Sequence, residues 1–151
     1  SSDVCSSDLH EILQAFQALA HYWQPTIETW CAPHPVFPDF TFRGGGLHEI
    51  PTNGFLGIHT DFTEHEGMYR RANTLLYLND GWQPSHRGEL IVQDTPIPPL
   101  WNLSVGFTTT VDSWHGHPEP WCRAEPRRSL ALYWYGTTPS TGHRKQGTTF
   151  R

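Results

Sequence analysis

The chain lacks any long hydrophobic run. Hydrophobic residues make up 36% of its 151 residues and its mean hydropathy is -0.53, and no stretch approaches the roughly 18 consecutive apolar residues that a membrane-spanning helix needs. Positive charge is also scarce, because ten Lys and Arg residues against fifteen Asp and Glu leave a net charge of -5. We therefore expect neither a membrane nor a nucleic-acid partner, and any anion-binding site must be local.

Paired cysteines are missing as well. Cys5, Cys31 and Cys122 form neither a Cys-x-x-Cys pair nor an even disulfide framework, so we expect a reducing, cytoplasmic setting. Aromatic residues, by contrast, make up 13% of the chain, far more than a disordered chain carries. The length favours a single domain.

The ends of the chain differ from the middle. Residues 1–9 have neither the basic nor the apolar region of a signal peptide and are similar to translated sequencing-adapter reads. We expect them to be non-native and some native chain before the helix to be missing. A single domain is expected over 10–135, followed by a polar tail over 136–151.

Hydrophobic periodicity predicts one helix followed by many short strands. Apolar residues recur every three or four positions from Leu9 to Trp23, and Pro25 is expected to end this helix. Later β-branched and aromatic runs, separated by Gly, Pro and Asn, predict strands over 40–45, 55–59, 73–79, 89–93, 103–110, 113–117 and 129–135. Between Gln93 and Asn102 the proline-rich segment is expected to form a rigid turn or an edge. The fold class that fits is mainly β: a double-stranded β-helix, or cupin-like jelly roll, with an N-terminal helix.

Histidine is abundant, with ten residues, and is the commonest metal ligand. In His59-Thr60-Asp61, which follows a predicted strand, the first and third side chains project to the same face. They supply two thirds of the 2-His-1-carboxylate triad of non-haem Fe(II) enzymes. His115 is the best candidate for the third ligand. His117 stays open between a group that orients His115 and an exposed residue.

The strand that begins near Arg127 carries two adjacent arginines. Alternation puts Arg128, Leu130, Leu132 and Trp134 on one face and Arg127 on the other. If the first face lines the barrel, Arg128 is a buried cation that needs an anion, and a small dicarboxylate would satisfy it.

Several ordered motifs carry a resemblance to a known family: GGGLHEIP, GFLGIHTDF, ANTLLYLND, WNLSVGFTT, DSWHGHPEP and RRSLALYWY. From about Phe42 to Tyr135 the chain resembles the Fe(II)/2-oxoglutarate-dependent dioxygenases of the prolyl 4-hydroxylase-like superfamily. The resemblance implies that His59, Asp61 and His115 bind iron and that Arg128 binds the distal carboxylate of 2-oxoglutarate. It also implies that Tyr77 hydrogen-bonds this cosubstrate, and Asn73, on the same strand face, is expected to line the pocket.

The function implied by the resemblance is hydroxylation of a C–H bond with O2, which converts 2-oxoglutarate to succinate and CO2, with ascorbate as reductant in an assay. The substrate class stays open between a prolyl residue, an amino acid and another small metabolite. Two alternatives remain: a non-catalytic or inactive metal-binding cupin-like domain, and a zinc-dependent hydrolase, whose site also uses His and carboxylate ligands.

Overall fold

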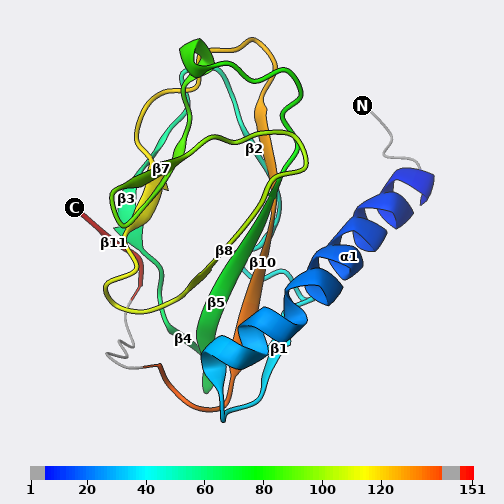
Figure 1. Cartoon of the computed structure of the whole chain (residues 1–151), viewed down its shortest axis with the longest axis vertical. Helices are drawn as coiled ribbons and strands as arrows, with labels where there is room; N and C mark the ends of the chain where they lie inside the picture. Colours follow the sequence, from blue (N-terminus) through cyan, green and yellow to red (C-terminus); the bar gives the residue numbers. More distant parts are fainter. Residues whose placement is uncertain (1–5, 141–146) are drawn as a thin grey trace.

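The computed structural model describes residues 6–140 and 147–151 (Figure 1). Residues 1–5, which include Cys5 and belong to the segment expected to be non-native, lie outside the described residues. Positions 141–146 of the expected tail do so as well. No helix in the described part of the chain has both the length and the apolar character that crossing a membrane requires.

The predicted helix is present but does not end at Pro25. Helix α1 runs over Ser6–Cys31 and contains Pro25 in its interior. A proline inside a helix costs about 3 kcal/mol. The turns beyond it offset this cost by burying Ile27, which is fully inaccessible to solvent, and Cys31.

Two antiparallel sheets form the jelly-roll core. The six-stranded sheet has the order β1 (Val36–Pro38), β10 (Arg127–Gly136), β5 (Met68–Tyr77) and β4 (Glu64–His65), with β2 (Gly46–Ile50) also pairing β10 and β8 (Ser104–Thr108) pairing β5. The five-stranded sheet has the order β11 (Thr149–Phe150), β3 (Leu56–Thr60), β9 (His115–His117), β6 (Leu90–Val92) and β7 (Thr95–Ile97). A short 3-10 helix, Pro84–His86, precedes β6.

The larger sheet has an apolar core on each face. Helix α1 packs on its outer face (Figure 1), where the buried residues are Phe16, Leu19, Ala20, Ile27, Cys31, Val36, Ala72, Leu130, Leu132 and Trp134. A second cluster on the inner side combines Leu75, Tyr77, Leu90, Phe107 and Ala131. Strand β10 therefore turns its most apolar face toward the helix.

Three segments differ in detail from the sequence expectations. Residues 40–45, expected to be a strand, form turns between β1 and β2. The proline-rich segment contributes β7, the edge strand of its sheet, which pairs only with β6 among the described strands. Pro96 is tolerated there because an edge strand has hydrogen-bonding partners on one side only. Residues 149–150, expected to belong to a tail, pair with Thr60 and His59 of β3.

Candidate metal and cosubstrate site

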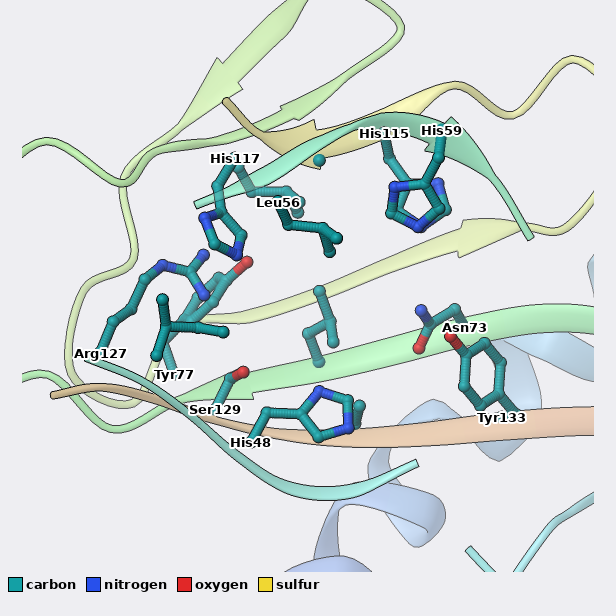
Figure 2. A pocket seen from close by; sticks show the side chains of 15 residues that line it. His48, Leu56, His59, Asn73, Tyr77, His115, His117, Arg127, Ser129 and Tyr133 are labelled. Carbon is teal, nitrogen blue, oxygen red and sulfur yellow. The ribbon is translucent and has the colours of Figure 1, made fainter. Parts of the chain in front are cut away.

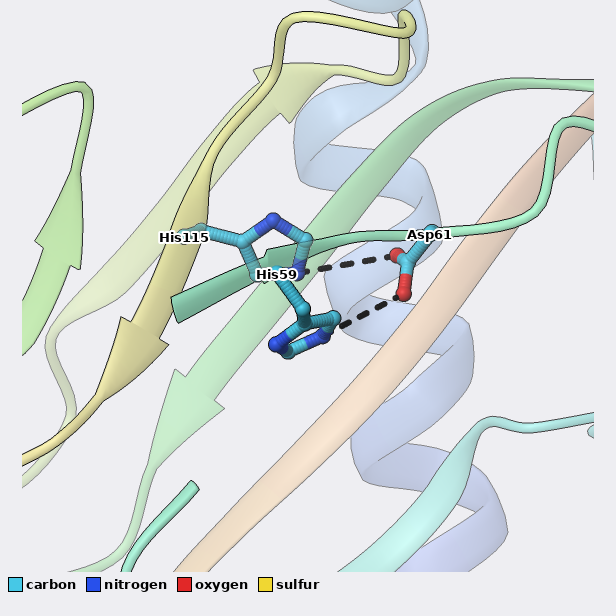
Figure 3. Close-up of side chains that lie close together, drawn as sticks. All are labelled: His59, Asp61 and His115. Atoms are coloured by element: carbon cyan, nitrogen blue, oxygen red, sulfur yellow. Dashed lines mark ion pairs between the residues drawn. The ribbon is translucent and has the colours of Figure 1, made fainter. Parts of the chain in front are cut away.

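Neighbouring strands of the smaller sheet bring three predicted metal ligands together (Figure 3). His59 of β3 and His115 of β9 are direct antiparallel partners, and Asp61 follows β3 by one residue. The ligand atoms of the three side chains all lie within 4.8 Å of one another. The His59 Nε2 to Asp61 Oδ1 distance is 3.5 Å and the His115 Nε2 to Asp61 Oδ2 distance is 3.6 Å. All three residues are buried.

Gly116 allows the two histidine-bearing strands to lie this close. A Cβ atom at this position would lie 2.7 Å from the main-chain oxygen of Gly57 and 2.8 Å from that of Leu56. Main-chain atoms of a paired strand cannot move aside without separating the strands. Close packing of β9 against β3 therefore requires a glycine between His115 and His117.

Both histidines have their Nε2 atoms free to bind a metal. Nδ1 of His59 donates to the carbonyl oxygen of Gly57 at 2.8 Å, and Nδ1 of His115 donates to that of Ser113 at 2.8 Å. Because a carbonyl oxygen can only accept, each Nδ1 carries the hydrogen and each Nε2 of the neutral ring presents a lone pair. Two imidazole nitrogens and one carboxylate suit Fe(II), and also Zn(II).

Electrostatics keep Asp61 ionised. Burial alone would raise the pKa of this carboxyl, but its interactions with His59, His115 and Arg70 outweigh burial and hold the pKa below its usual range. For His59, burial is the largest single effect and opposes protonation, yet the interactions with Asp61 and with the Gly57 carbonyl together outweigh it and raise the pKa. For His115, burial dominates and lowers the pKa. The buried carboxylate thus favours a cation at this point.

A cavity of about 100 Å³ extends from the triad between the two sheets. Figure 2 shows His59 and His115 at one end, with Asn73 and Tyr133 nearby, and Arg127, Tyr77 and His117 at the other. The predicted pocket residues Tyr77 and Asn73 both line this space, as expected from the inner face of β5.

The structure corrects the expected register of the arginine strand. Arg128 lies outside the cavity, with its side chain 45% exposed and paired with Glu49 of β2. Arg127 is the buried residue, only 4% exposed, and lines the cavity together with Ser129, Ala131 and Tyr133. The reason is that α1 covers the face with Leu130, Leu132 and Trp134, so the opposite face of β10 looks into the barrel.

Arg127 has no acidic partner among the described residues. Its Nε donates to the carbonyl oxygen of Gly88 at 2.9 Å, and its guanidinium carbon lies 5.0 Å from the centre of the Tyr77 ring. Burial lowers the pKa of Arg127, with Tyr77 acting in the opposite direction. A buried guanidinium without a carboxylate calls for an anionic ligand.

Several further polar atoms around the cavity lack a hydrogen-bond partner in the described part of the chain. They are the Tyr77 hydroxyl, Asn73 Oδ1, His117 Nδ1 and one terminal nitrogen of Arg127. Burial, followed by the charge of Arg127, lowers the pKa of His117 to about 3, so this ring is neutral at physiological pH. Buried polar atoms are normally satisfied, and their clustering here marks a place for a polar ligand.

The sequence analysis missed Arg127, Tyr133 and Arg70 as residues of this site. Alternation along β10 would have found the first two, once the apolar face had been assigned to the helix. A bulge hides Arg70: Ala72 pairs with Trp134 but Arg70 pairs with Tyr135, so Arg71 is the extra residue. The bulge reverses the alternation that runs back from Tyr77 and turns Arg70 inward.

Comparison with known proteins agrees with this geometry. The sequence profile of the 2OG-Fe(II) oxygenase superfamily matches residues 45–136. No curated protein matches the chain.

Solved structures with a similar fold include two prolyl 4-hydroxylases. One is from Phytophthora capsici, with 20% identity, a TM-score of 0.57, and coverage of 80% of this chain and 42% of the other. The second is from Pseudomonas putida, with 20% identity, a TM-score of 0.55, and coverage of 78% of this chain and 64% of the other. The chain thus spans less than two thirds of the length of either structure.

Proposed function

Because the chain belongs to the 2OG-Fe(II) oxygenase superfamily, we propose that it is an Fe(II)- and 2-oxoglutarate-dependent dioxygenase that hydroxylates a C–H bond. The observation that carries the proposal is a cavity lined at one end by the two histidines of the buried His59, Asp61 and His115 cluster and at the other end by a buried arginine without an acidic partner among the described residues. A structural metal site or a metal-dependent hydrolase uses no carboxylate-bearing cosubstrate, so neither alternative explains a buried arginine in the cavity.

In this proposal His59, Asp61 and His115 hold the iron. Bound Fe(II) supplies the redox chemistry, in which O2, 2-oxoglutarate and a substrate C–H bond give succinate, CO2 and the hydroxylated product. The Nδ1 hydrogen bonds to Gly57 and Ser113 fix the two imidazole rings for coordination. Three protein ligands leave coordination positions open for the cosubstrate and O2.

Arg127, rather than Arg128, binds the distal carboxylate of 2-oxoglutarate. Its planar guanidinium can donate two parallel charge-assisted hydrogen bonds, and its burial keeps water from competing. The Tyr77 hydroxyl and His117 lie at the same end of the cavity and each offers an unpaired polar atom. Asn73 lies toward the metal end (Figure 2).

The substrate is proposed to be a small molecule or a peptide, with a prolyl residue or an amino acid among the candidates. The two structural neighbours, both prolyl 4-hydroxylases, support this range. We also propose that 10–135 is a single catalytic domain in a cytoplasmic setting, where the free thiols of Cys31 and Cys122 stay reduced.

Turnover of 2-oxoglutarate tests the proposal. The purified chain with Fe(II), ascorbate and O2 should convert 2-oxoglutarate to succinate, and a screen of amino acids and prolyl peptides should accelerate the conversion when the substrate is found. Asp61→Ala, which removes the carboxylate ligand, should give none. Metal binding without succinate formation under any of these conditions would favour a non-catalytic metal-binding domain instead.

A further inference from the structure

The three candidate metal ligands are not supported in the same way. His59 and His115 are held by carbonyl groups within their own sheet. Asp61 lies just beyond the end of β3 and so receives no support from the strand ladder. Its position depends on side chains from the opposite sheet.

Tyr133 provides the direct support. It lies on the inner face of β10, is 7% exposed, and its hydroxyl donates to Asp61 Oδ2 at 3.0 Å. The other carboxylate oxygen, Oδ1, faces Nε2 of His59. The hydrogen bond thus fixes the rotation of the carboxylate and leaves Oδ1 available for a metal.

Arg70 in turn fixes the Tyr133 ring. Its guanidinium is sandwiched between two aromatic rings, 3.6 Å from the centre of Tyr133 and 3.7 Å from that of Phe62. Nε of Arg70 donates to the hydroxyl of Tyr135 at 2.8 Å, and a terminal nitrogen lies 3.9 Å from Asp61 Oδ2. Arg70 is 2% exposed, so neither ring nor cation can move independently.

We propose that Tyr133, clamped by Arg70, is a positioning residue that orients the Asp61 carboxylate for metal binding. The inference rests on the proposed metal site. It assigns to strand β10 a role at both ends of the cavity: Arg127 toward the anion and Tyr133 toward the metal. Residues that hold a metal ligand in place are typically responsible for 10- to 100-fold in metal affinity.

Two matched variants test the proposal. Tyr133→Phe removes the hydroxyl that contacts Asp61 but keeps the ring that stacks on Arg70. Tyr135→Phe removes a hydroxyl from the same face of the same strand, one that contacts Arg70 and not Asp61. We would measure anaerobic binding of Fe(II), and of Mn(II) as a redox-stable substitute, by calorimetry, with near-UV circular dichroism to verify folding.

Tyr133→Phe is expected to weaken metal binding by about 10- to 100-fold, and Tyr135→Phe, whose hydroxyl acts on Asp61 only through Arg70, is expected to weaken it clearly less. At saturating metal, 2-oxoglutarate should bind Tyr133→Phe with parental affinity, since Arg127 is untouched. Equal metal affinity of parent and Tyr133→Phe overturns the positioning role and leaves the proposed function standing, as does an equal loss in both variants. A parent that binds no metal overturns the proposed function itself, and the positioning role with it.

Discussion

The two adjacent arginines of β10 allow a sharp test of the cosubstrate site. Arg127→Gln should weaken 2-oxoglutarate binding, whereas Arg128→Gln should leave it unchanged. The two positions are neighbours in sequence, but Arg127 is 4% exposed in the cavity and Arg128 pairs with Glu49 on the outer side of the sheet. Each variant removes one positive charge, so long-range electrostatic effects on an anion are nearly matched.

The magnitude follows from the burial of Arg127. Hydrogen bonds to charged groups contribute about 1.5 to 3 kcal/mol, and no described carboxylate competes for this guanidinium. At about 1.4 kcal/mol per factor of ten, Arg127→Gln should raise the Kd of 2-oxoglutarate by about 10- to 150-fold. Metal affinity should not change, because Arg127 lies at the far end of the cavity from His59 and His115 (Figure 2).

Ligand-induced stabilisation gives a convenient assay. With Mn(II) present and 2-oxoglutarate at 100 times the parental Kd, the parent and Arg128→Gln should each gain about 2.7 kcal/mol in unfolding free energy. A variant with 100-fold weaker binding should gain only about 0.4 kcal/mol under the same conditions. Equal gains in both variants, or a larger loss in Arg128→Gln, would refute the assignment of the inward face of β10.

Three further predictions concern packing and pH. Ile27→Ala should lower the unfolding free energy in urea by about 2 to 5 kcal/mol because the side chain is fully buried beyond Pro25. A change below 0.5 kcal/mol, as expected at an exposed site, would mean that this part of α1 is not packed on the sheet. Gly116→Ala should weaken metal binding, since the added Cβ pushes the β3 main chain away from β9; parental affinity in calorimetry would contradict this. Between pH 6.5 and the lowered pKa of His117, about 3, the unfolded state binds a proton that the folded state does not. Stability of the metal-free protein should therefore fall as the pH falls, by up to about 1.4 kcal/mol per pH unit from this group, and His117→Asn should show a shallower slope in urea titrations.

The sequence was sufficient to predict that His59, Asp61 and His115 come together in the fold. His59 and Asp61 are two residues apart near a strand end, and His115 pairs directly with His59. The jelly-roll fold class and the presence of the N-terminal helix are confirmed as well. These features depend on local periodicity and on motifs that lie within single strands.

The features that sequence reasoning got wrong depend on which partner a face meets. We expected the face with Leu130, Leu132 and Trp134 to line the barrel because it is apolar, but α1 needs an apolar partner and takes that face. The helix passes Pro25 because burial beyond the proline outweighs the local cost. Arg70 faces inward only because a bulge shifts the alternation of β5, and a sequence pattern of period two cannot show where a bulge lies.

Strand β10 also fixes the distance between the two ends of the cavity. Arg127 and Tyr133 project from the same extended segment, six residues apart, so their Cα atoms are separated by about 20 Å at a rise of about 3.3 Å per residue. Sliding the strand by one residue against its neighbours would exchange its two faces and put Arg128 inside, so the position of the inward arginine relative to the metal ligands can change only in steps of two residues, about 7 Å. A ligand longer by one methylene group cannot be matched by such a step. The proposed cosubstrate site would therefore discriminate between ligands by length, and small adjustments would come from side chains that reach in from other strands, such as His48 and His117.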